Sequence, residues 1–306
     1  MFFKDGKRFL KDGGGAFKNP LVSDKIRRIY RDEIVPTLHF VADTFTSEFG
    51  LDFQYLQSNL MGSTGKQPDS GDIDVALDED CYDSNTLRSL AEKVRKVLGN
   101  DYVVSKGIPG GQLNLAIPIK GNPENGYIQV DFILGNLDWL KFSHHSPGLD
   151  VSPYKGVYIS TALGVLAKMN KSWELHVGEE RVARVGWAFD LERGLFIRTQ
   201  VQLRPGQGMS NVDADRFETV VWTKFDTKPP RVFRSGYIKD PEAVVQILLG
   251  EEVTLSDIDT FEKLVEVVRN VYPERFDEFL DRCKEALTRS SAVKEREKIE
   301  KLELFR

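Results

Sequence analysis

The stretch DIDVALD at residues 72–78 constrains this chain more than any other part of its sequence. Its acidic and apolar residues alternate, which is the pattern of a strand with one buried face. Because side chains in a strand repeat every two residues, the apolar residues share one face, and Asp72 and Asp74 share the other. Two neighbouring carboxylates with no basic residue between them repel each other, and a divalent cation removes that repulsion. The stretch therefore predicts a strand that presents two acidic metal ligands.

The composition is typical of a globular protein with a sizeable core. Of the 306 residues, 41% are hydrophobic and 29% are charged. The longest apolar runs fall short of the roughly 20 residues that a membrane span needs, and the charged first residues do not form a signal peptide. Cys81 and Cys283 lie far apart, without ligand spacing, which argues against a structural zinc site. We therefore expect a cytoplasmic protein without a membrane partner.

Apolar periodicity divides the chain into three parts. We expect an N-terminal arm over residues 1–22, an α+β domain over 23–170, and an accessory domain, first β-rich and then helical, over 171–306. Spacing of threes and fours predicts helices at 23–50, kinked or divided by Pro36, at 84–98, and at 156–170. Alternation predicts strands at FQYLQSNLMGS, DIDVALD, DYVVSK, QLNLAIPI and YIQVDFILG.

Two further features complete a candidate metal and nucleotide site. Asp131 is the one acid in the largely apolar strand YIQVDFILG, so it is placed to join the first two acids from a neighbouring strand. Three such acids can hold two metal ions about 3.5–4 Å apart for an in-line transfer at phosphorus. The turn Gly62-Ser63 precedes the acids, and its N–H groups and hydroxyl can bind phosphate oxygens. Each feature alone is weak, because Asp-x-Asp and Gly-Ser occur often by chance, but their combination favours a site.

In combination these segments resemble the nucleotidyltransferase superfamily that includes DNA polymerase β, poly(A) polymerases, CCA-adding enzymes and the oligoadenylate synthetases. The resemblance rests on LMGS at 60–63, DIDV at 72–75 and VDF at 130–132. SGDIDVALD and SPYKG also resemble predicted nucleotidyltransferases of tailed phages, which would place the protein in the host cytoplasm. The resemblance implies a polymerase-β-like domain, in which a mixed sheet is flanked by helices.

The resemblance also implies a role for each motif residue. Asp72 and Asp74 would bind two Mg²⁺ or Mn²⁺ ions, and Asp131 would bind the ion that activates the acceptor hydroxyl and help to remove its proton. Gly62 and Ser63 would hold the β- and γ-phosphates of a nucleoside triphosphate such as ATP. The acceptor oxygen would then attack the α-phosphate, and pyrophosphate would leave.

Other candidates receive weaker support. Lys66 lies in the motif loop and can neutralise a triphosphate, whereas the other lysines are typical of a surface. Adjacent histidines point in different directions on a regular element, so we do not expect His144 and His145 to ligate one metal together. Arginines after residue 173 either bind the acceptor or are solvated positions on strands: Arg198, Arg204, Arg231 and Arg234. Tryptophans in the same region either stack on bases or pack in a core: Trp173, Trp187 and Trp222.

The function predicted from the sequence is transfer of a nucleoside monophosphate to an acceptor hydroxyl. The acceptor would be a nucleic acid, such as tRNA or another RNA, or a protein. An alternative is a second-messenger synthetase or a protein AMP- or UMP-transferase. An alternative of another class is a catalytically silent module that binds nucleotides or RNA. The three acids argue against the silent module, which has no need of all three.

Overall fold

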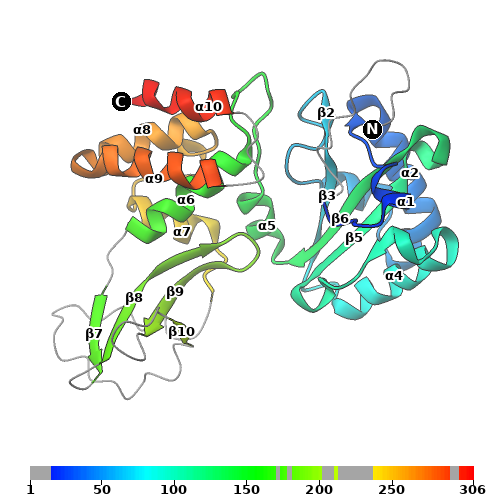
Figure 1. Ribbon diagram of the computed structural model, residues 1–306, viewed down its shortest axis with the longest axis horizontal. Coiled ribbons are helices and arrows are strands. Elements are labelled where there is room, and N and C mark those ends of the chain that lie inside the picture. Colours follow the sequence, from blue (N-terminus) through cyan, green and yellow to red (C-terminus); the bar gives the residue numbers. More distant parts are fainter. Residues whose placement is uncertain (1–14, 170–172, 178–180, 202–209, 213–236, 290–295) are drawn as a thin grey trace. The chain divides into compact units, whose positions relative to one another are not determined.

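The computed structural model describes residues 15–169, 173–177, 181–201, 210–212, 237–289 and 296–306 (Figure 1). The chain divides into two compact units, Met1–Pro153 and Tyr154–Arg306. We expected the boundary at residue 170, but the helix that follows Pro153 belongs to the second unit. Among the described residues, no helix is both long enough and apolar enough to cross a membrane.

A mixed four-stranded sheet forms the centre of the first unit, which is α+β as predicted. The strands lie in the order β3-β6-β5-β4, and β3 and β6 run parallel, whereas β5 is antiparallel to both of its neighbours. A short separate ladder joins β1 to β2. The strands of this unit are β1 Ile29–Tyr30, β2 Asp69–Ser70, β3 Asp72–Asp78, β4 Val103–Val104, β5 Gln112–Pro118 and β6 Tyr127–Gly135.

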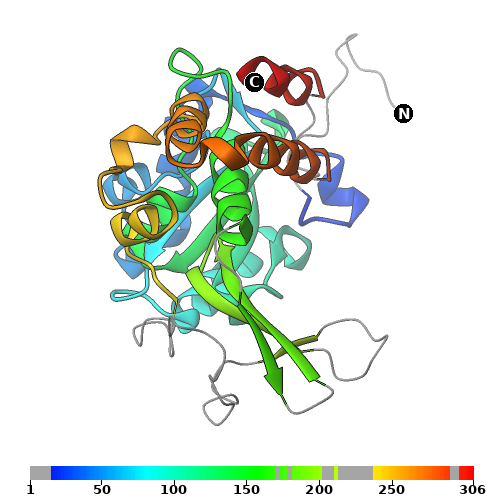
Figure 2. The same cartoon turned by 90° about the vertical axis from the view of Figure 1, so that its left-hand side faces the viewer.

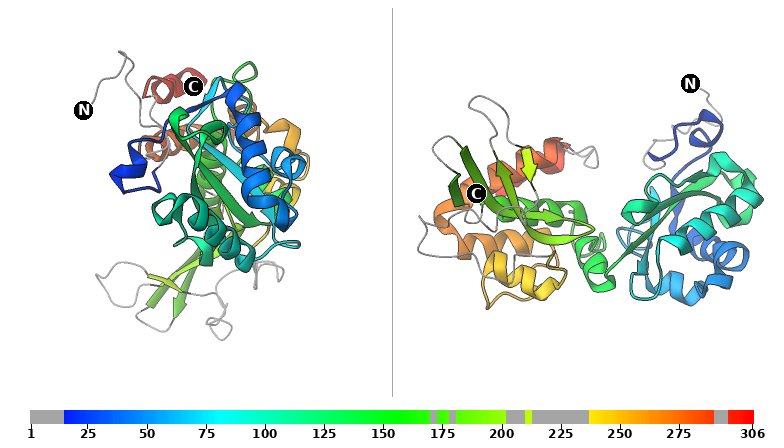
Figure 3. Two further views of the ribbon diagram at one scale, coloured as in Figure 1. Left: turned by 90° about the vertical axis from the view of Figure 1, so that its right-hand side faces the viewer. Right: turned by 90° about the horizontal axis from the view of Figure 1, so that it is seen from below.

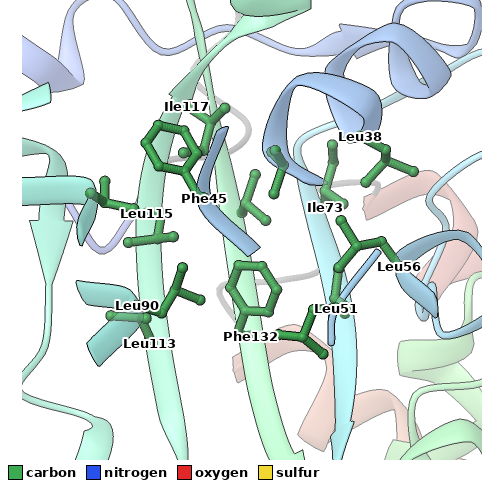
Figure 4. Close-up of a cluster of buried hydrophobic side chains, with 14 of the residues drawn as sticks. Leu38, Phe45, Leu51, Leu56, Ile73, Leu90, Leu113, Leu115, Ile117 and Phe132 are labelled. Atoms are coloured by element: carbon green, nitrogen blue, oxygen red, sulfur yellow. The ribbon is translucent and has the colours of Figure 1, made fainter. Parts of the chain in front are cut away.

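Helices cover one face of this sheet and form the main hydrophobic core with it (Figures 1 and 3). Leu38 of α2, Leu90 of α4 and Phe132 of β6 are each fully buried within this core (Figure 4). The opposite face of β3 and β6 carries two small apolar clusters, one with Ala76 and Ile133 and one with Tyr127, and polar side chains lie between them. The helices of the first unit are α1 Pro20–Ser23, α2 Arg31–Val41, which continues as a π-helical turn Ala42–Thr46, α3 Phe53–Ser58, α4 Ser84–Leu98 and α5 Leu137–Ser143.

Two predicted elements differ from the structure. The helix expected from residue 23 begins at Arg31, because Ile29 and Tyr30 pair with Asp69 and Ser70 in the β1–β2 ladder. The strand expected at FQYLQSNLMGS is wrong, since Phe53–Ser58 is the helix α3. The carboxylate of Asp52 accepts a hydrogen bond from the N–H of Tyr55 at 2.8 Å and so caps this helix.

The N-terminal segment is packed where the structure describes it, although we expected a loose arm over residues 1–22. Phe17 is 5% exposed and packs in a small apolar cluster with Val22, Ile26, Ala116 and Tyr127. Ala116 and Tyr127 belong to β5 and β6, so residues 16–26 lie against the face of the sheet that α2 and α4 leave open.

The second unit contains an antiparallel sheet in the order β10-β9-β8-β7 and a group of helices. Figure 2 shows the long hairpin that β8 and β9 form. Helix α6 packs against α9 and β8. The strands are β7 Trp173–Val177, β8 Arg181–Asp190, β9 Gly194–Val201 and β10 Ser210–Val212. The helices are α6 Gly156–Met169, α7 Pro241–Leu249, α8 Phe261–Val271, α9 Phe276–Arg289 and α10 Arg296–Glu300.

Candidate metal and nucleotide site

The three predicted acids lie together on the open face of the first sheet. Asp74 of β3 is directly beside Asp131 of β6 in the parallel register, and Asp72 is two residues before Asp74 on the same face. Asn114 of β5 is the partner of Asp131 on its other side, and Gln129 is the partner of Asp72. The face therefore carries a row of polar side chains across three strands, with Asp131 at its centre.

The acids are close enough to influence one another strongly. Burial raises the pKa of Asp74 well above its ordinary value, and the charges of Asp72 and Asp131 raise it further. Burial also raises the pKa of Asp131 to about 6, with a smaller contribution from the charge of Asp72. Side-chain hydrogen bonds from Asn114 and Gln129 act in the opposite direction. Such a group of partly buried like charges is characteristic of functional sites.

Both carboxylate oxygens of Asp131 accept hydrogen bonds from amide side chains. Asn114 donates from Nδ2 to Oδ1 at 2.8 Å, and Gln129 donates from Nε2 to Oδ2 at 2.8 Å. Neither amide was expected from the sequence. Gln129 lies two residues before Asp131 in the same strand, and this shared phase is a signal that could have found it. The place of Asn114 beside Asp131 depends on the pairing of β5 with β6, which no local pattern reveals.

Gly62 lies directly against Asp74. Its φ is +63°, and a Cβ atom there would come within 2.9 Å of Oδ2 of Asp74. Its N–H donates to the carbonyl oxygen of His144 at 3.1 Å, so this N–H is already engaged and does not face an open site. Glycine is therefore required at this position by the left-handed backbone and by the neighbouring carboxylate.

The residues before Gly62 follow the outer side of β3. The N–H of Met61 donates to the carbonyl of Asp74, and the N–H of Ala76 donates to the carbonyl of Asn59, both at 2.9 Å. The hydroxyl of Thr64 donates to the carbonyl of Asp72 at 3.3 Å. These bonds hold the Gly62-Ser63 turn beside the acidic residues of the strand.

The loop after the turn offers a hydroxyl and an ammonium group. Ser63 uses its carbonyl to accept bonds from the hydroxyl of Ser70 and the N–H of Lys66. Within the described part of the chain, the Ser63 hydroxyl and the Lys66 ammonium group have no hydrogen bond or ion pair. Burial lowers the pKa of Lys66, as expected of a half-buried cation that lacks a carboxylate partner. Both groups are thus available to an anion.

The other candidates contribute less to this site. Burial lowers the pKa of His144, whose ring Nδ1 lies 3.2 Å from the carbonyl oxygen of Leu140 and 3.1 Å from the Ser143 hydroxyl, at the end of α5. Trp187 is 8% exposed in the second unit. Trp173 and Arg198 lie in β7 and β9, where only the backbone is described. The remaining candidates lie outside the described residues: Trp222, Arg204, Arg231 and Arg234.

The oxygen donors of the three acids suit a metal ion that takes part of its ligands from outside the chain. The described side chains include no group of three or more His, Cys, Asp or Glu that is arranged to hold a metal ion by itself. Mg²⁺, however, is usually bound by one or two carboxylates together with water and the phosphate oxygens of its substrate. The hard oxygen donors of Asp72, Asp74 and Asp131 fit that chemistry, with the remaining ligands supplied from outside the chain.

Comparison of the chain with protein-family models gives no match, and comparison with curated proteins gives none.

Proposed function

We infer that this chain is a metal-dependent nucleotidyltransferase with a polymerase-β-like first unit. The observation that carries this proposal is the direct pairing of Asp74 with Asp131 on parallel strands, with Asp72 on the same face. A chain gains nothing in stability from gathering three carboxylates on a half-buried surface, because their charges repel and burial penalises each of them. The arrangement is accounted for by a cationic ligand.

The reaction would be an exchange of one P–O bond for another. The acceptor oxygen would form a bond to the α-phosphorus of a nucleoside triphosphate, and the bond to the bridging oxygen of pyrophosphate would break. The proton of the acceptor hydroxyl would pass to Asp131 or to solvent. Two bound Mg²⁺ or Mn²⁺ ions would supply charge neutralisation at the attacking and leaving oxygens. Asp72 and Asp74 would hold them, and Asp131 would complete the set on the side of the acceptor.

The loop after Gly62 would hold the triphosphate. The hydroxyl of Ser63 can donate a charge-assisted hydrogen bond to a phosphate oxygen, and the ammonium group of Lys66 can neutralise phosphate charge. Because the N–H of Gly62 is already bonded to His144, we assign to Gly62 close approach to the acids and not donation to a phosphate. The phosphates would thus be bound by side chains more than by this backbone group.

The acceptor would be a nucleic acid, such as tRNA or another RNA, or a protein, and the site itself is compatible with each. A second-messenger synthetase would use a nucleotide as acceptor at the same acids. A silent nucleotide-binding module would bind the triphosphate without turnover. These alternatives differ in where the nucleotide label is found after incubation.

The test is to incubate the protein with each α-labelled nucleoside triphosphate and Mg²⁺ or Mn²⁺, alone and with tRNA, DNA or total cell protein. We expect labelled acceptor and free pyrophosphate from the wild type, and neither from Asp74→Asn. The matched control is Asp78→Asn, because Asp78 lies on the same face of β3 but four residues away from Asp74. Nucleotide binding without release of pyrophosphate under every condition would contradict the enzyme and favour the silent module.

A further inference from the structure

Two buried amide side chains, Asn114 and Gln129, surround the carboxylate of Asp131. Asp131, Asn114 and Gln129 are 6%, 7% and 7% exposed, so the carboxylate is held almost entirely within the protein. Each of its oxygens accepts one amide hydrogen bond at 2.8 Å. A carboxylate oxygen has two lone pairs, so each oxygen keeps one for a further ligand. The amides therefore leave the carboxylate able to bind a cation while they restrict how it can be oriented.

Orientation of this carboxylate is otherwise weakly determined. The terminal torsion of an aspartate is broad, and its two oxygens interchange on half a rotation. Rotation of the Asp131 carboxylate would break both amide bonds at once and leave buried donors unpaired, which is unfavourable. Asn114 and Gln129 come from different strands and approach different oxygens, so together they define the plane of the carboxylate.

The N-terminal segment determines the orientation of one of these amides. The N–H of Ala16 donates to Oε1 of Gln129 at 3.3 Å, which directs the amide nitrogen of Gln129 towards Asp131. The next residue, Phe17, is 5% exposed and anchors the segment against β5 and β6. A chain of hydrogen bonds therefore runs from the backbone of Ala16 through Gln129 to the central acid of the site.

We propose that Asn114 and Gln129 are positioning residues that hold the Asp131 carboxylate ready to bind a divalent cation, and that the N–H of Ala16 fixes the amide of Gln129 for this task. The proposal rests on the proposed function for the metal site, but not on the identity of the nucleotide or acceptor. Partners of metal-binding side chains commonly contribute about 10- to 100-fold to metal affinity, and we expect the two amides to do the same.

The test measures Mn²⁺ affinity by calorimetry in the absence of nucleotide, with the full-length chain. Asn114→Leu and Gln129→Met keep approximate side-chain volume but lose the donors, and each should weaken Mn²⁺ binding about 10- to 100-fold. The matched control is Gln112→Met, on the same face of β5, where the side chain is opposite Ile133 and away from Asp131. Its Mn²⁺ affinity should equal that of the wild type.

A second pair of variants tests the N-terminal segment without changing a side chain of the site. Ala16→Pro removes the N–H that Gln129 accepts, and it should weaken Mn²⁺ binding in the same direction as Gln129→Met. Gly15→Pro stiffens the same segment but keeps that N–H, and a Cβ atom at Gly15 would meet nothing within 4 Å. Affinity should therefore be unchanged in Gly15→Pro. If the Gln129 variant does not fold, this pair still tests whether the orientation of the Gln129 amide matters for Mn²⁺ binding.

A background without the acid separates positioning from general stability. In Asp131→Asn, Gln129→Met should cause no additional loss of Mn²⁺ affinity, because there is no carboxylate left to orient. Wild-type affinity in folded Asn114→Leu, Gln129→Met and Ala16→Pro would overturn the positioning role and leave the proposed function intact. Failure of the wild type itself to bind Mn²⁺ would overturn the metal site, and the positioning role with it.

Discussion

Substitution of Gly62 by alanine should disturb the site while the protein stays folded. Gly62 has a φ of +63°, and a non-glycine residue in this left-handed region costs about 1–2 kcal/mol. An added Cβ atom would lie 2.9 Å from Oδ2 of Asp74, whereas ordinary contact begins at 3.4 Å. The carboxylate is the free end of a short side chain, so it would yield before the backbone does. It would move by about 0.5 Å, which is the tolerance within which a catalytic group must be held.

The fold and the site can be measured separately on the same variant. Urea unfolding should show a loss of about 1–2 kcal/mol in Gly62→Ala. The rate of pyrophosphate release should fall by about tenfold, since misplacement by about 1 Å can reduce the rate of an enzyme by about 100-fold. Mn²⁺ titration should show a loss of affinity in the same direction, because Asp74 is a proposed metal ligand.

Gly65 provides the control, because it has a φ of +75° and a Cβ atom there would meet nothing within 4 Å. Gly65→Ala carries the same conformational cost without the contact, so it should lose similar stability and keep its Mn²⁺ affinity. Equal Mn²⁺ affinities in the two folded variants would refute the argument, because Gly62 would then place no constraint on Asp74.

Three further predictions concern single side chains. Ser63→Ala should weaken nucleotide binding in Mg²⁺ by about 1.5–3 kcal/mol, the worth of a hydrogen bond to a charged group, and an unchanged dissociation constant would reduce Ser63 to a turn residue. Asp74→Asn should raise the melting temperature of the metal-free protein, because it relieves repulsion from Asp72 and Asp131. The same variant should no longer be stabilised by Mg²⁺. An unfolded variant would favour a structural role for the acid. Glu33→Gln should destabilise the fold by about 1.5–3 kcal/mol, because Glu33 accepts bonds from Arg27 at 2.8 and 2.9 Å. Burial opposes ionisation of Glu33, but hydrogen bonds from Arg27 and Tyr30 lower its pKa below 4.5. The stability that the ionised Glu33 contributes should therefore be complete above pH 4.5 and be lost as the pH falls through the lowered pKa. Urea unfolding should show this pH dependence in the wild type and not in Glu33→Gln.

The elements that the sequence predicts well are those with a long, regular apolar period. Alternation correctly predicted the strands β3, β5 and β6. Apolar residues spaced three and four apart correctly predicted the helices α4 and α6. In α3 the alternation was misleading, because six residues are too few to separate the two periods and the capping role of Asp52 decided the outcome. The start of α2 depends on the pairing of β1 with β2, a long-range contact that no local pattern reveals.

The same distinction applies to the candidate site. The common face of Asp72 and Asp74 follows from the period of a strand, so the sequence predicts it. That Asp131 lies beside Asp74 depends on the register between two strands that are distant in the chain, which the sequence leaves open. The hydrogen bond from the N–H of Gly62 to the carbonyl of His144 is equally non-local. Because of it, the N–H of Gly62 is not available to a phosphate.

The hydrogen bonds along the outer side of β3 also limit what can pair with this edge of the sheet. In the described sheet β3 is an end strand, and an uncovered end strand invites pairing with another polypeptide and hence aggregation. Residues 59–61 occupy the backbone groups of Asp74 and Ala76 that such a partner would need. The segment that leads into the Gly62-Ser63 turn therefore also covers this edge of the sheet. A change in this segment that released the two hydrogen bonds would leave backbone groups of β3 unpaired at the edge of the sheet, where another polypeptide could pair with them.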